Sequence, residues 1–173
     1  MAWTTPKTWT VDEVVGASDM NTHLRDNLVA LKAPPHFETA FASGVLALST
    51  TATEFTAITG SLQAALTTYG GDVQFYMAGM YSRDGADRRV SFDVQVDSTG
   101  RYHASAVEGW GRFTIEVSTA ISGVTKIFGP VWITGLASGS HTFQPLWKTN
   151  AGTAFLHATT AVAPIYMWAR EVS

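Results

Sequence analysis

The sequence predicts a mainly β protein in which an N-terminal extended arm and a short α-helix precede one antiparallel β-sandwich of the jelly-roll type. Three observations lead to this prediction. A helical spacing of apolar residues occurs once, between Ser18 and Pro34; alternation of apolar and polar residues recurs from Phe37 onward; and glycine-bearing turns separate the alternating segments. Many short strands without a second helix are typical of a sandwich or a jelly roll. We therefore divide the chain into an arm and assembly helix, residues 1–35, and a β-sandwich domain, residues 36–173.

The arm and the helix occupy the first part of the chain. Residues 1–16 contain Thr, Trp and Pro without helical periodicity, which is typical of an extended arm. The helix follows, because Ser18 is a favourable N-cap and Asp19 places a negative charge in the first turn. Its apolar residues form a narrow stripe: Met20, Leu24, Leu28 and Leu31. The prolines at 34 and 35 end the helix, which is then about 20 Å long and marginal in water unless the stripe packs on something.

The clearest strand lies at residues 89–97. Apolar residues occupy every second position there, so one face is expected to be buried, while Ser91 and Asp93 lie on the opposite face and are expected to meet solvent. Residues 113–117 repeat the pattern. The other expected strands cover residues 37–43, 54–58, 73–81, 125–134, 141–148, 153–158 and 165–172. Pro145 cannot donate to a strand ladder, which predicts an edge strand or a bulge at 141–148.

Composition and motifs argue against several classes of function. Charged residues make up only 14% of the chain, the net charge is −3, and 11 Lys and Arg residues are spread along its length, so we expect no nucleic-acid partner. No signal peptide is visible, and no apolar segment approaches the roughly 20 residues of a membrane span. The chain has no cysteine, no metal-ligand spacing among its five histidines, and no P-loop, HExxH or Gly-x-Ser-x-Gly string. We therefore expect no catalysis, no metal, no cofactor and no membrane insertion.

The N-terminal segment resembles the opening segment of many tailed-phage and prophage structural proteins. The strings WTTPKTWT at residues 3–10, EVV at 13–15 and MNTHLRDNL at 20–28 carry the resemblance, and the polar string does not follow from helix periodicity. Asp12 stands where that family often has Gly. Two later stretches, residues 67–73 and 135–148, are similar to the β domains of the same proteins. The resemblance implies a virion component, made in the host bacterial cytoplasm, with a jelly-roll domain that is frequently trimeric.

The apolar stripe has two interpretations. It docks on its own sandwich, or it meets copies of itself around a three-fold axis, and we favour the homotrimer. Asn27, beside the stripe, then resembles the polar residue that fixes the register of coiled coils. The strand at 165–172 supports the same prediction, because Tyr166 and Trp168 place large apolar groups on the face that does not fill the core.

One aromatic segment is the candidate for ligand contact. Tyr102, His103 and Trp110 lie among small residues, an arrangement that suits sugar stacking or protein contact. Two alternatives stay open, since Trp110 can also pack in the core of a hairpin, or the segment can lie at an interface between subunits.

Two functions follow from these observations. The leading prediction is a non-catalytic, trimeric tail-fibre-like adsorption appendage, in which residues 1–33 anchor the chain to other virion proteins and the sandwich contacts a host-surface glycan or protein. The alternative is a capsid decoration protein that stabilises or cements the head. A depolymerase ranks third, because the sequence gives no reason to place two carboxylates across a cleft.

Overall fold

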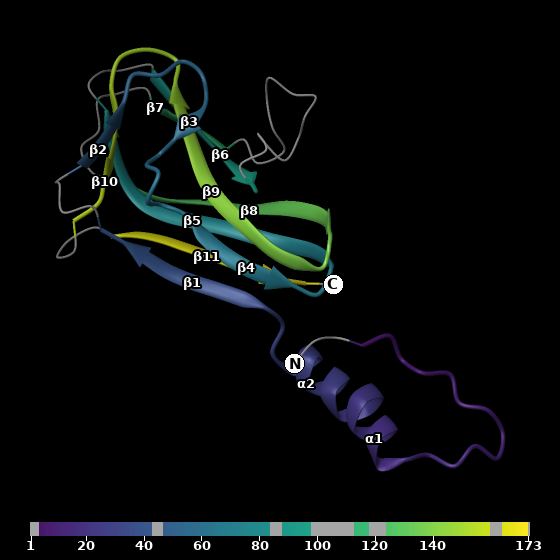
Figure 1. Cartoon of the computed structure of the whole chain (residues 1–173). Helices are drawn as coiled ribbons and strands as arrows, with labels where there is room; N and C mark the ends of the chain where they lie inside the picture. The colour runs from purple at the N-terminus through teal and green to yellow at the C-terminus, as the bar shows by residue number, and fades with distance from the viewer. Residues whose placement is uncertain are drawn as a thin grey trace.

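The structure is a computed structural model of the chain, and it describes residues 4–42, 47–83, 88–97, 113–117, 124–159 and 164–172. Two antiparallel sheets pack face to face, and the arm and helix project from one end of the sandwich (Figure 1). The expected fold class, mainly β with an N-terminal helix and an antiparallel sandwich, is confirmed.

The strands divide into two sheets within the described residues. The six-stranded sheet contains β1 (His36–Phe41), β2 (Ala47–Thr50), β5 (Gly71–Arg83), β8 (Val124–Leu136), β10 (Ala154–His157) and β11 (Ile165–Glu171). The five-stranded sheet contains β3 (Thr56–Ala57), β4 (Ala64–Thr68), β6 (Arg88–Val96), β7 (Phe113–Val117) and β9 (Gly139–Thr149).

Eight of these strands have the order of a jelly roll. One sheet runs β1-β11-β5-β8 and the other β4-β9-β6-β7, with every neighbouring pair antiparallel. Counted along the chain, the first sheet therefore holds the first, eighth, third and sixth strands, and the second holds the second, seventh, fourth and fifth. The chain crosses between the sheets at almost every connection, as in jelly rolls. Strands β2, β3 and β10 are short additions to this arrangement.

The core lies between the two sheets. Its largest fully buried side chains include Trp147, Phe75 and Phe143, and the rings of the last two are parallel with centroids 6.2 Å apart. Strand β6 buries its apolar face as expected, but Ser91 and Asp93 on its other face are buried as well. The prediction that Ser91 and Asp93 meet solvent is wrong, because β6 lies inside its sheet. Side chains of the neighbouring strands on the same outer face, such as the buried Leu146 beside Asp93, cover the polar side chains of β6.

Three expectations for the strands need correction. Residues 54–58 form only the two-residue β3, whereas β2 and β4 were not expected. Strand β9, which carries Pro145, is not an edge strand, since it pairs with β6 on one side and with β3 and β4 on the other. Pro145 lies between the part of β9 that pairs with β3 and the part that pairs with β4. No described strand on that side needs an N–H donor at this position, so the missing N–H of Pro145 costs no hydrogen bond, and its carbonyl accepts from the Ile58 amide.

The N-terminal helix runs from Ala17 to Lys32. It consists of α1 (Ala17–Met20), a π-helical segment η1 (Asn21–Asp26) and α2 (Asn27–Lys32). The predicted Ser18 cap is wrong, because the extended Gly16 is the N-cap and Ser18 lies inside the first turn. Within the described residues, no helix is both long and apolar enough to span a membrane.

Candidate binding and assembly surfaces

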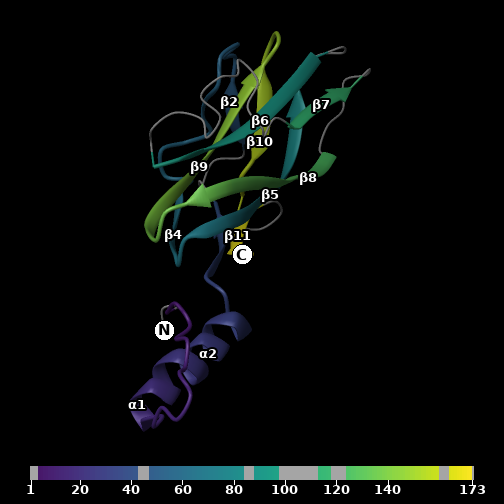
Figure 2. The same ribbon diagram turned by 90° about the vertical axis from the view of Figure 1, so that its right-hand side faces the viewer.

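The arm folds back along the helix instead of extending away from it (Figure 2). The amide of Asn27, a buried side chain, makes the central contact. Its Oδ1 accepts from the backbone N–H of Thr4 at 2.9 Å, and its Nδ2 donates to the carbonyl oxygens of Thr4, at 2.7 Å, and His23, at 3.1 Å. The side-chain amide of Asn27 thus binds both backbone groups of Thr4, its N–H and its carbonyl, as the backbone of a neighbouring strand would.

Further polar contacts hold the arm. His23 lies four positions before Asn27 on the same helix face, and its Nδ1 is 3.2 Å from the Thr5 carbonyl oxygen. Lys7 forms ion pairs with Glu13 and Asp19. The hydrogen bond to Glu13, then that to Asp19, raises the pKa of Lys7, and the hydrogen bond from Lys7 lowers the pKa of Glu13.

These contacts give a physical reason for the polar string at residues 20–28. His23 and Asn27 do not serve the periodicity of the helix; they hold the backbone of the arm. The Asn27 amide is hydrogen-bonded within one chain. Its role in fixing the register of a trimer stays a prediction. We call residues 4–32 the arm–helix unit.

The apolar stripe lies outside these contacts. Met20, Leu24, Leu28 and Leu31 are 44–64% exposed, and Val29 beside them is also exposed. Of the two interpretations of the stripe, docking on its own sandwich is wrong, because none of its four residues is buried by the described part of the chain. Packing against a second copy, or against another protein, stays a prediction.

The joint between the helix and the sandwich is tied at Pro35. Its carbonyl accepts from the backbone N–H of Glu171 at 2.9 Å. The buried carboxylate of Glu171 in turn accepts from the backbone N–H of Tyr69, at 2.9 and 3.1 Å for its two oxygens. A cavity of about 420 Å³ lies between the helix end and this region. The first residues of β1 are therefore fixed to the sandwich, and the helix ends just before them, at Lys32.

The outer surface of the six-stranded sheet carries aromatic side chains. Tyr166 is 45% exposed, as expected for the face of β11 that does not fill the core, and Trp168 is half-buried. The Trp168 indole stacks on Tyr76 of β5, with centroids 4.9 Å apart and an interplanar angle of 5°. Trp132 of β8, 44% exposed, lies on the same side, opposite Gln74. We call Tyr76, Trp132, Tyr166 and Trp168 the aromatic face.

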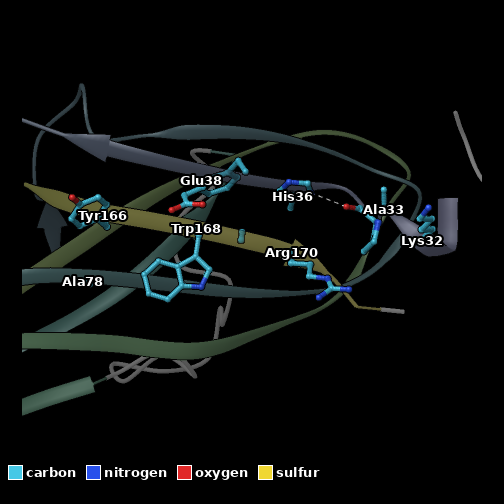
Figure 3. A pocket seen from close by; sticks show the side chains of 11 residues that line it. Lys32, Ala33, His36, Glu38, Ala78, Tyr166, Trp168 and Arg170 are labelled. Carbon is cyan, nitrogen blue, oxygen red and sulfur yellow. Dashed lines mark hydrogen bonds between the residues drawn. The ribbon is translucent and has the colours of Figure 1, made fainter. Parts of the chain in front are cut away.

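A groove of about 680 Å³ runs beside β11, from the end of the helix along β1 (Figure 3). Trp168 and Tyr166 line it together with Glu38 of β1 and Arg170 of β11. We call this the β11 groove. Sequence reasoning singled out the two aromatic residues but missed the two charged ones, although both alternate outward along expected strands.

His141 and Asp97 form a polar pair at the end of the five-stranded sheet. His141 Nδ1 is 2.7 Å from Asp97 Oδ2, and His141 Nε2 is 2.8 Å from the Ala137 carbonyl oxygen. The hydrogen bond with Asp97 raises the pKa of His141. Burial alone would raise the pKa of Asp97, but its hydrogen bonds from His141 and the Thr142 amide together lower it. This pair joins β9 to the end of β6.

Other candidates from the sequence lie elsewhere. Tyr102, His103 and Trp110 fall outside the described residues. Across the described ranges, no cluster of three or more His, Cys, Asp or Glu is arranged to hold a metal ion.

No protein-family model matches the sequence, and a search of curated proteins finds no relative. Among solved structures, the chain is similar to VP2 of infectious bursal disease virus in the crystal structure of its subviral particle, with 8% sequence identity and a TM-score of 0.28. The alignment covers 80% of this chain and 37% of that one, so the chain spans well under two thirds of its neighbour. A TM-score this low does not establish a shared fold, and the function of this chain therefore rests on its own residues.

Proposed function

We propose that this chain is a non-catalytic structural component of a tailed-phage virion, a trimeric tail-fibre-like appendage. Residues 1–33 attach it to other virion proteins, and the sandwich contacts the host surface. The observation that carries the proposal is the segment at residues 3–28. It resembles the opening of phage structural proteins, and its described part folds into a unit with an exposed apolar stripe.

The stripe supports attachment through the helix. Fully burying a Leu side chain contributes roughly 1.5–3 kcal/mol, before the entropy of ordering the helix is subtracted. Leu24, Leu28 and Leu31 are each at least half exposed, so most of that contribution is still available to a partner. Three helices packed together, or a groove on the particle, would use it.

The position of the helix also supports this division of roles. The arm–helix unit projects from the sandwich (Figure 2), and Asn27 and His23 hold the arm without covering the stripe. The sandwich, held together by its own core, is then free to face outward. Jelly rolls of this kind occur in both capsid and lectin domains.

Substitution of the stripe tests the anchor. Replacing Leu24 and Leu28 together by Asp places two charges in the packed seam, so the full-length protein is expected to fold and to lose incorporation into particles. Deleting residues 1–33 should have the same effect. The matched control replaces Ile127 by Asp, because Ile127 is an exposed apolar residue of the sandwich and lies outside residues 1–33. Wild-type occupancy of the Leu24/Leu28 variant on purified particles would place the anchor in the sandwich.

Two measurements separate the proposal from its alternative. Light scattering at micromolar concentration should give the mass of three chains, and a mass near one chain would contradict the trimer. Electron microscopy of particles should then locate the protein. Density at the tail supports adsorption, whereas density across the head lattice supports capsid decoration instead.

A further inference from the structure

The β11 groove presents an aromatic ring with one face already covered. The Trp168 indole is stacked on Tyr76, whose hydroxyl is 3.5 Å from Gln74 Oε1. Tyr76 does not line the groove, whereas Trp168 does, so the stack leaves the other side of the indole to the groove. A ring held in this way loses little conformational entropy when a ligand binds.

Hydrogen-bonding groups stand around this ring. Glu38 lies opposite Trp168 in the β1–β11 register, and Arg170 follows Trp168 on the same side of β11 (Figure 3). Neither the carboxylate nor the guanidinium forms a hydrogen bond or an ion pair with another described residue. An acceptor and a donor of hydrogen bonds are thus both available beside an apolar surface.

The charges indicate which kind of ligand would fit. Glu38 and Arg170 have opposite signs at the ring, and Lys32 lies at the far, helix end of the groove (Figure 3). Covering both charges with a protein surface would require a matched partner for each, because an unpaired buried charge is costly. Sugar hydroxyls both donate and accept, so one uncharged ligand satisfies the two groups at once.

The dimensions agree with a small ligand. A volume of about 680 Å³ lies within the roughly 300–1,000 Å³ that is typical of small-ligand sites. The C–H groups on one side of a pyranose ring are apolar and slightly positive, and they complement the negative face of an indole. We propose that the β11 groove binds a pyranose residue of an uncharged glycan, with the ring stacked on Trp168 and its hydroxyls bound by Glu38 and Arg170. This deepens the proposed adsorption role and rests on that role for its biological setting. It assigns Trp168 to the ligand, so the contact between the chains of the trimer is then made by the helix stripe and not by Trp168.

The test uses the full-length protein labelled with 5-fluorotryptophan, with the resonances of Trp168 and Trp132 assigned from their Phe variants. The probes are hexasaccharides of α-linked glucose, β-linked glucose and N-acetylglucosamine, with a hyaluronan hexasaccharide as the acidic comparator. At least one uncharged probe should shift the ¹⁹F resonance of Trp168 saturably. Isothermal titration calorimetry, which does not depend on the Trp168 resonance, compares the variants. Trp168→Ala should raise the Kd of this probe at least about tenfold and Glu38→Gln by a smaller factor, whereas the matched control Trp132→Ala should change it less than about twofold.

Four results would overturn the inference. The first is that no probe in the millimolar range shifts the ¹⁹F resonance of Trp168 saturably. The second is that Trp132→Ala loses as much affinity as Trp168→Ala, and the third is that the protein prefers the acidic probe. The fourth is that the Trp168 resonance shifts with protein concentration alone. The last would identify the groove as an interface between copies of the chain. Failure here is distinct from failure of the proposed function, because incorporation into particles is measured separately through Leu24 and Leu28. Trp168→Ala protein should still load onto particles, and those particles should adsorb less well to cells.

Discussion

Apolar side chains are buried in the sandwich and exposed on the arm–helix unit. Between the sheets, Phe75, Phe143 and Trp147 are almost completely removed from solvent. On the helix, Leu28 and its neighbours along the stripe face outward, while Asn27, a polar residue, is buried by its hydrogen bonds to the arm. The sandwich therefore depends on hydrophobic burial, and the arm–helix unit depends on directed polar contacts.

The difference indicates which part is complete by itself. Burial of apolar surface is the main favourable contribution to folding, and in the sandwich the apolar side chains between the sheets are already buried. The net contribution of a hydrogen bond is only about 0.5–1.5 kcal/mol, so the contacts of Asn27 shape the arm without adding much stability. Under the proposed function, a partner that covers the stripe should raise the stability of the arm–helix unit.

The largest expected effect is in the core of the sandwich. Trp147→Ala should lower the free energy of unfolding by about 3–5 kcal/mol, because it removes a fully buried aromatic side chain. The matched control Trp132→Ala, on the outer surface, should cost less than about 1 kcal/mol. Urea denaturation followed by circular dichroism measures both. Similar losses in the two variants would mean that the sandwich is not stabilised chiefly by its interior.

A smaller and local effect is expected at the arm. Asn27→Ala should release the arm at a cost of about 0.5–1.5 kcal/mol, because the backbone groups of Thr4 exchange their hydrogen bonds with Asn27 for hydrogen bonds with water. Hydrogen exchange of the Thr4 amide should become faster, while urea unfolding of the sandwich stays unchanged. Asn21→Ala is the control, because Asn21 is an exposed residue of the same helix. Retained protection of Thr4 in Asn27→Ala would show that the arm is held by other contacts.

The His141–Asp97 pair should contribute less than about 1 kcal/mol, because the Asp97 side chain is 42% exposed and its charge is screened by solvent. The folded pKa of His141 is raised above 6.5 and that of Asp97 is lowered below 3.8. The stabilisation is therefore full between these two values. It is lost as the pH rises through the folded pKa of His141, and also as the pH falls through that of Asp97.

Comparison of the wild-type chain with His141→Gln across pH measures this contribution. The difference in unfolding free energy should be largest between pH 3.8 and pH 6.5 and should decline on both sides. A difference that grows above pH 7 would show that neutral His141 is the stabilising form.

The smallest effect is expected on the stripe. At concentrations where the chain is monomeric, Leu28→Gln should change stability by no more than about 0.5 kcal/mol, because Leu28 is already exposed. Ala30→Gln is the contrasting variant. Ala30 is buried on the same helix, so the larger polar side chain should lower the melting temperature of the helix. Thermal melting followed at 222 nm compares the two. A large loss from Leu28→Gln in the monomer would mean that the stripe packs within its own chain.

The sandwich could be predicted largely from the sequence, since alternation is a local signal. Strand β6 shows it from Val90 to Val96, and its apolar face is buried as expected. Strands β2 and β4 were missed because they are short and consist largely of Ala, Ser and Thr, which leave alternation faint. The prediction that Pro145 marks an edge strand is wrong because a proline can lie inside a sheet where the strands beside it end. Where β3 and β4 end is a property of the assembled sheet and not of the local sequence.

The arm and the β11 groove could not be predicted in the same way. The arm is held through the backbone groups of Thr4, which any residue type offers, by a side chain 23 positions away. The groove brings Glu38 beside Trp168, residues from strands near opposite ends of the chain, and only the β1–β11 register places them together. Local periodicity carries no information about either contact.

The position of β11 has a consequence for synthesis. Among the described strands, β11 is the only one hydrogen-bonded to β1, and it lies between β1 and β5. The ribosome makes β1 long before β11, so the nascent chain carries an unpaired strand edge of the kind that invites pairing with other chains. Contacts so distant in sequence also form slowly. A translational pause just before residues 165–171 is therefore expected to lower the yield of folded protein, whereas a pause of equal length before β1 is made should not.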